Sequence, residues 1–302
     1  KVYIPDDEIA WAPATVTRTL GGSKFEVEVE RPANGKRGSK KALYTGSVVV
    51  DTSGPGFEGM DSLPLQNADT GDSQGVEDMC ALNHLHEPAI LYNLRRRFMS
   101  RLPYTYTGEI CIAINPYQWL DIYAKELGQR YKEASKRSDL SPHVYATSAQ
   151  AFKGLQTYGV NQSILVSGES GAGKTETVKI LLNHLADIAG SSADDRTIEK
   201  VITSNPLLES FGNAKTLRND NSSRFGKFTE LQMDARCRLS GSQSNTYLLE
   251  KVRVVSHAKG ERTYHIFYQL LAAPDSVKKS YCLEGQDSTC FRYTNMGGDQ
   301  EG

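Results

Sequence analysis

The chain has 302 residues, with 35 Lys and Arg against 36 Asp and Glu, so its formal net charge is -1. This balance argues against a protein that binds nucleic acid through bulk electrostatics, and no apolar run approaches the ~18 residues of a membrane span. The five cysteines are scattered without a C-x-x-C pair, which argues against a zinc site or a disulfide framework and favours a reducing, cytoplasmic compartment.

Residues 1–52 are expected to form a small antiparallel β-barrel. Short apolar runs recur between glycine-rich turns, and Phe25, Val27 and Val29 alternate with charged residues. Alternation with a period of two is typical of a strand with one buried face. The chain opens on Lys1 rather than Met, so we expect it to be part of a longer protein.

A Gly-, Ser- and Pro-rich linker is predicted at residues 53–75, and the main domain is expected to span residues 76–302. Its first helix begins at Glu87 and turns arginines 95–97 mainly to solvent, while its other face carries an apolar stripe of Ile90, Leu91, Leu94 and Phe98. Strands alternate with helices along the domain. This order predicts an α/β fold with a mixed, mostly parallel central sheet flanked by helices and incomplete in this chain.

The central feature of this domain is a glycine-rich turn. Residues 163–166 predict a buried strand before it, and an apolar stripe predicts a helix after it that ends at Gly190. The turn fits G-x-x-x-x-G-K-[ST], the phosphate-binding loop, with the residues Gly168, Glu169, Ser170, Gly171, Ala172, Gly173, Lys174 and Thr175. Its glycines allow successive N–H groups to face an anion, and the helix begins with its positive dipole end there. The sequence therefore predicts a nucleotide site.

A second polar stretch, residues 219–227, combines an amide, two adjacent hydroxyls, a guanidinium and a glycine. Together with the phosphate loop it resembles the first nucleotide-sensing switch of the myosin motor domain. The similarity extends through residues 247–251 and 261–270, and the N-terminal barrel is similar to one that many myosins carry. Kinesins also have Asn-x-x-Ser-Ser-Arg, usually with a different residue pair after the arginine.

The resemblance implies a P-loop NTPase core that binds ATP and Mg²⁺. Lys174 and the loop backbone would hold the β- and γ-phosphates, and Thr175 and Ser223 would ligate Mg²⁺. Asn219 and Ser222 would contact the phosphates and order the attacking water.

The resemblance assigns further roles beside the phosphates. Arg224 would form a salt bridge to a glutamate on the family's second switch, and Glu169 would organise its polar neighbours. Asn115, Pro116 and Tyr123 match the loop that contacts the adenine.

The implied function is an actin-based motor, cytoplasmic and associated with the cytoskeleton, that hydrolyses ATP. Actin filaments would be its track, and light chains or calmodulin would bind a lever arm beyond this chain. Two other interpretations stay open: a P-loop phosphotransferase, and a nucleotide-binding module without turnover.

The second switch of the family, an apolar strand ending in Asp-x-x-Gly-Phe-Glu, has no match in the sequence. Residues 187–190 and 72–75 have the D-x-x-G spacing, but the first lies at the far end of the helix after Lys174 and the second in a polar linker. We therefore expect Arg224 to stay unpaired and the chain alone not to complete a hydrolytic cycle.

Overall fold

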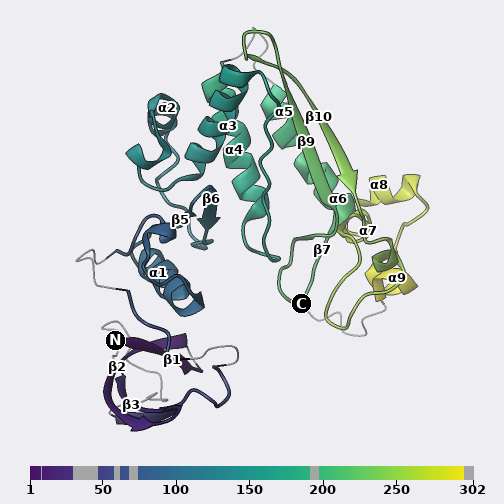
Figure 1. Cartoon of the computed structure of the whole chain (residues 1–302). Helices are drawn as coiled ribbons and strands as arrows, with labels where there is room; N and C mark the ends of the chain where they lie inside the picture. Colours follow the sequence, from purple (N-terminus) through teal and green to yellow (C-terminus); the bar gives the residue numbers. More distant parts are fainter. Residues whose placement is uncertain (8, 30–46, 58–61, 68–73, 191–196, 296–302) are drawn as a thin grey trace. The chain divides into compact units, whose positions relative to one another are not determined.

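The computed structural model describes residues 1–7, 9–29, 47–57, 62–67, 74–190 and 197–295 (Figure 1). They fall into two compact units, one of residues 1–119 with 141–143 and the other of the remaining residues. Within the described ranges, no helix combines the length and apolar character needed to cross a membrane. The predicted division at residues 52 and 76 stays a prediction.

The first unit begins with an antiparallel sheet, whose strands pair in chain order: β1 (Val2–Asp6), β2 (Ala10–Gly21), β3 (Lys24–Val29) and β4 (Ser47–Asp51). The predicted antiparallel strands are thus confirmed. The described pairings make an open meander, because β4 pairs with β3 alone, and closure into a barrel stays a prediction.

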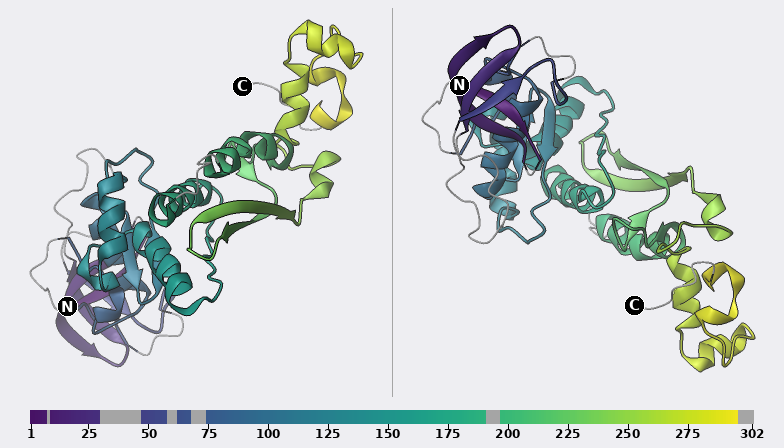
Figure 2. Two further views of the ribbon diagram at one scale, coloured as in Figure 1. Left: turned by 90° about the horizontal axis from the view of Figure 1, so that it is seen from above. Right: turned by 90° about the horizontal axis from the view of Figure 1, so that it is seen from below.

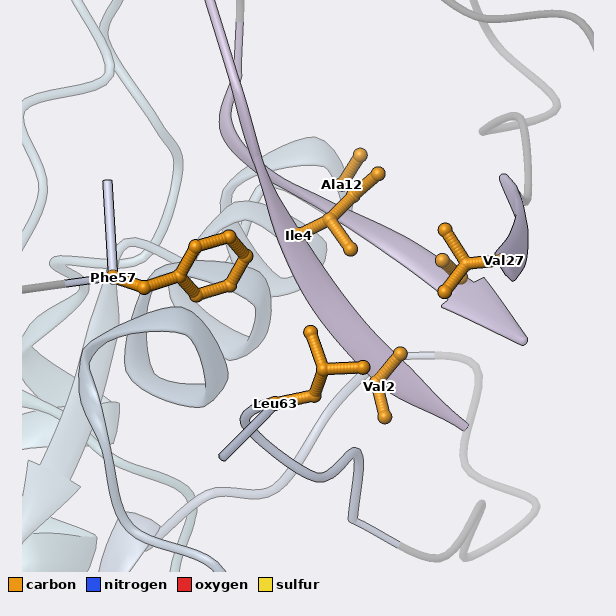
Figure 3. Packing of buried hydrophobic residues seen from close by; sticks show 7 residues of the cluster. Val2, Ile4, Ala12, Val27, Phe57 and Leu63 are labelled. Atoms are coloured by element: carbon orange, nitrogen blue, oxygen red, sulfur yellow. The ribbon is translucent and has the colours of Figure 1, made fainter. Parts of the chain in front are cut away.

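Side chains from one face of this sheet form an apolar core. The alternation in β3 buries Val27 completely, and the side chains packed with it in Figure 3 include Val2, Ile4, Ala12, Phe57 and Leu63. Phe57 and Leu63 come from the segment that follows β4. The backbone N–H of Tyr3 donates to the Pro64 carbonyl at 2.8 Å, so this segment covers the free edge of β1.

Among its described residues, the rest of the first unit contains a short 3-10 helix, an α-helix and a short hairpin. These elements are η1 (Met79–Ala81), α1 (Glu87–Met99), β5 (Tyr104–Thr107) and β6 (Ile110–Ala113).

The buried face of α1 differs from the prediction. Arg97 is 3% exposed, whereas Phe98, from the expected apolar stripe, is 39% exposed. The Arg97 guanidinium donates to the Tyr104 carbonyl at 2.9 Å and to Thr105 Oγ1 at 2.9 Å. The expectation of a solvent-facing triplet is wrong for Arg97 because polar groups of β5 replace water around its charge.

The second unit contains mainly helices. They are α2 (Lys125–Glu133), η2 (Arg137–Asp139), α3 (Val144–Tyr158), α4 (Lys174–Ala189), α5 (Thr197–Thr203), α6 (Asn205–Gly212), η3 (Lys251–Val254), α7 (His265–Leu271), α8 (Asp275–Ser280), η4 (Ser288–Cys290) and α9 (Arg292–Asn295). Its strands are β7 (Asn213–Ala214), β8 (Ser222–Ser223), β9 (Gly226–Met233) and β10 (Leu239–Tyr247).

The sheet of this unit is not the predicted one. Among the described strands, β9 pairs with β10 and β7 with β8, and both ladders are antiparallel (Figure 2). Residues 163–166 form no strand, and Leu165 is 91% exposed. A mostly parallel sheet with a buried strand before the loop is therefore wrong for the described residues. An apolar run forms a strand only where a second strand can pair with it. The turn after β9 brings β10 alongside as its partner, whereas no described strand pairs with residues 163–166.

Helix α4 is held by apolar contacts along its length. Leu182 packs with Ile198 and Val201 of α5, and Ile188 packs with Phe152 of α3. These clusters fix the helix whose first residue is Lys174.

A buried histidine adds a polar anchor between α4 and its neighbours. His184 is 3% exposed and its ring stacks on Tyr145, with the ring centroids 4.1 Å apart. Its Nε2 lies 3.0 Å from the Gly128 carbonyl and must donate to it, and in the neutral ring Nδ1 accepts from the Ser148 hydroxyl at 2.6 Å. The imidazole thereby links α2, α3 and α4.

The stability of the chain is expected to fall as the pH drops below about 6.5, the ordinary pKa of histidine. Burial lowers the pKa of His184, and the hydrogen bond to Gly128 and the charge of Asp187 oppose this only in part. The unfolded chain therefore takes up the proton first. The free energy of unfolding then decreases by up to about 1.4 kcal/mol per pH unit, until the folded pKa is reached.

Urea unfolding at several pH values between 5 and 8 measures this slope. His184→Gln keeps one donor and one acceptor but does not titrate, so it should make the profile shallower in this window. Burial also lowers the pKa of His265, so part of the slope should remain. An unchanged slope in that variant would assign the pH dependence to other groups.

Candidate phosphate-binding site

The glycine-rich loop has the backbone conformation that its sequence predicts. Gly171 and Gly173 have φ angles of +84° and +95°, in the left-handed region that favours glycine. A Cβ on Gly168 would lie 3.2 Å from the Ala172 Cβ, so the turn is closed tightly. Helix α4 then begins at Lys174, and its first N–H groups and positive dipole end face the loop.

The Lys174 ammonium lies over this loop. Nζ donates to the carbonyl oxygens of Gly168 and Glu169, both at 2.8 Å. The two carbonyls thus hold the Lys174 ammonium beside the loop, next to the N-terminus of α4. The arrangement can bind an anion with several oxygens, such as a polyphosphate.

Most of the second polar stretch belongs to the segment between α6 and β9, residues 213–225, which we name the switch loop. Asn219 closes a turn within it: its N–H donates to Thr216 Oγ1 at 3.2 Å, and its Oδ1 accepts from the Asn221 N–H at 3.0 Å. Further along, Ser222 pairs with Ala214 in the short β7–β8 ladder. The loop thus folds on itself, with Ser222 only 2% exposed.

Two side-chain contacts bring the phosphate loop and the switch loop together. The Ser170 hydroxyl donates to Ser222 Oγ at 3.0 Å, across 52 residues of sequence. Arg218 Nη1 lies 3.1 Å from Glu169 Oε2, across 49 residues. The second contact is exposed and contributes little free energy. The first involves a buried hydroxyl and therefore fixes the relative position of the two loops more firmly.

Arg224 is paired, which corrects the prediction that it lacks a partner. Its Nε donates to Glu250 Oε2 at 2.6 Å, and its Nη1 donates to Ser222 Oγ at 3.2 Å. Burial by itself raises the pKa of Glu250, but hydrogen bonds from Arg253 and Arg224 outweigh it, so the pKa lies below its ordinary value. Glu250 is therefore ionised at neutral pH and holds Arg224 as a true ion pair.

The other predicted residues lie on α4, on β8 and in the stretch of residues 115–123. Thr175 stands in the first turn of α4 and Ser223 on β8, and both are exposed. Asn115 and Pro116 belong to the first unit, whereas Tyr123 belongs to the second, like the phosphate loop. Their contact with the adenine, and the two magnesium ligands, stay predictions.

Sequence reasoning missed the acidic and basic groups that support the site. Glu250 and Arg253 lie just after β10, and Arg218 precedes Asn219 within the switch loop. No spacing pattern marks them, because each meets its partner only through the tertiary fold. Their one signal is that Glu250 falls inside the stretch 247–251 that carries the family resemblance.

Comparison with known proteins supports the family resemblance that the phosphate loop and the switch loop carry. The model of the myosin head (motor domain) family matches residues 76–301. Over 99% of its length the chain is 47% identical to unconventional myosin-Va of Gallus gallus, and over 98% it is 43% identical to myosin-14 of Arabidopsis thaliana. It spans 15% and 18% of these two relatives. The match covers most of the chain and includes both loops, and the chain therefore belongs to the myosin head (motor domain) family.

Proposed function

We propose that the protein containing this chain is an actin-based motor that binds Mg-ATP and hydrolyses it to move along actin filaments. The observation that carries the proposal is the contact between Ser170 and Ser222, because it joins a phosphate loop to the polar loop that would sense the γ-phosphate. Membership of the myosin head family supports the same activity.

The residues of both loops suit Mg-ATP. Lys174 would bind the outer phosphates together with the N–H groups of the loop and of α4. The exposed hydroxyls of Thr175 and Ser223 would ligate Mg²⁺, which supplies charge neutralisation to the phosphate oxygens. Asn115, Pro116 and Tyr123 would contact the adenine.

Hydrolysis would depend on positioning rather than on a strong base. Ser222 Oγ accepts from Ser170 and from Arg224, so its own hydrogen is left to donate to a phosphate oxygen or to the attacking water. Asn219 would contact the phosphates and help to order the same water. In phosphoryl transfer, positioning and charge stabilisation provide most of the rate.

The activity of the chain alone is proposed to be incomplete. It spans less than a fifth of the two relatives compared above and has no match to the second switch. Actin filaments, light chains or calmodulin would bind the complete protein, which we propose to be cytoplasmic and associated with the cytoskeleton.

The binding of a fluorescent ATP analogue to this chain tests the proposal. We expect saturable binding that requires Mg²⁺ and is lost on adding EDTA, with slow phosphate release that actin filaments do not accelerate. No binding at any magnesium concentration would contradict the nucleotide site. Phosphate transfer to an added acceptor would favour a phosphotransferase.

A further inference from the structure

A chain of four alternating charges lies behind the switch loop. Arg224 Nε donates to Glu250 Oε2 at 2.6 Å, and Arg253 Nε donates to the same oxygen at 2.7 Å. Arg253 Nη1 in turn donates to Glu261 Oε2 at 2.9 Å. We name Arg224, Glu250, Arg253 and Glu261 the charge chain.

The charge chain reaches both ends of the switch loop. At its far end, the N–H of Glu250 donates to the Arg224 carbonyl at 3.0 Å, so backbone and side chain of Glu250 hold the same residue. At its near end, the N–H of Arg262, the residue after Glu261, donates to the Lys215 carbonyl at 3.0 Å. The Tyr264 hydroxyl donates to the Glu250 carbonyl at 2.6 Å and fixes the segment between them.

Burial makes this arrangement hard to disturb. The Arg253 side chain is only 5% exposed and that of Glu261 15%. Removing one partner of a buried ion pair leaves an uncompensated charge, which is far more costly than losing a surface pair. Glu250 is the member that joins this buried part to Arg224, whose side chain is 29% exposed.

From this geometry we propose that Glu250 and Arg253 are positioning residues of the site. They hold Arg224, and through its bond to Ser222 Oγ they keep the Ser222 hydroxyl against Ser170 of the phosphate loop. Neither residue is required to touch the nucleotide. The expected effect on nucleotide binding rests on the proposed function, whereas the expected effect on the conformation of the switch loop does not.

Hydrogen exchange of the nucleotide-free chain tests the conformational part. In Glu250→Gln, amides of residues 213–225 should exchange at least about tenfold faster, because the loop opens locally at a smaller free-energy cost. Amides of the β9–β10 hairpin should be unchanged. Glu250→Asp keeps the charge and should restore part of the protection. The matched control is Arg238→Gln, which breaks the 2.7 Å pair with Asp234 at the turn of the same hairpin.

Binding of the fluorescent ATP analogue tests the path through Ser222. Glu250→Gln should weaken the affinity about tenfold, and Ser222→Ala should weaken it as well. Because Glu250→Gln is expected to act through Ser222, the double variant should bind the analogue only slightly more weakly than Ser222→Ala alone.

Three results would overturn the inference: unchanged exchange in residues 213–225, equally faster exchange throughout the unit, or additive effects of the two substitutions. If Glu250→Gln does not fold, Arg253→Lys replaces it, since it keeps the charge but loses the planar contact to both carboxylates. A wild-type chain that binds no nucleotide would refute the proposed function, and the exchange experiment would still decide the role of Glu250.

Discussion

Lys174→Ala is expected to weaken binding of the Mg-ATP analogue by about a hundredfold or more. The substitution removes a charge whose hydrogen bonds to phosphate oxygens contribute about 1.5–3 kcal/mol each. Among the residues predicted to hold the β- and γ-phosphates, Lys174 alone carries a positive charge. Isothermal titration or analogue fluorescence measures the loss.

Lys179→Ala is the matched control for this substitution. Lys179 stands on the same helix and pairs with Glu176 at 2.7 Å, so the variant removes the same formal charge farther from the loop. It should bind the analogue nearly as well as the wild type. Equal affinities of the two variants would show that the Lys174 ammonium takes no part. Thermal unfolding must accompany both, because Lys174 also bonds the carbonyls of Gly168 and Glu169.

The sequence predicted best those elements whose ends are marked locally. Helix α4 begins directly after Gly173 and ends before Gly190, as its apolar stripe and flanking glycines indicate. Strand β3 coincides with the alternation around Val27. In these cases the information lies within a few residues of the element itself.

The predictions that failed depend on partners that lie outside the element itself. Residues 163–166 have the composition of a strand but no neighbour to pair with among the described residues. Arg97 is buried because β5 offers acceptors to it, which the periodicity of α1 does not show.

In the site, too, local motifs were predicted from the sequence and contacts with other segments were not. Both loops were predicted from their motifs, but the partner of Arg224 was not. Glu250 lies 26 residues further along the chain, on the far side of the β9–β10 hairpin, and only the fold brings it to Arg224.

Gly212→Ala is expected to destabilise the chain by about 1–3 kcal/mol and to displace the switch loop. A Cβ at this buried position would lie 2.3 Å from Cε1 and 2.4 Å from Cδ1 of Phe225. The Gly212 carbonyl also accepts from the Arg224 N–H at 2.9 Å, so the two backbone segments cannot separate without lengthening this bond, and the Phe225 ring has to rotate instead. Urea unfolding measures the stability, and analogue binding measures the displacement.

Gly154→Ala in α3 separates this clash from the general effect of replacing glycine in a helix. There a Cβ would meet the side-chain amide of Gln162 at 2.9 Å, and that flexible group can move aside. Since alanine is favoured over glycine inside a helix by about 0.5–1 kcal/mol, this variant should be neutral or more stable. Combining Gly212→Ala with Phe225→Leu should recover part of the lost stability, because the smaller side chain leaves room for the new methyl group. Equal stability of the two alanine variants would contradict the packing of Gly212 against Phe225, and with it the close support of the switch loop by α6.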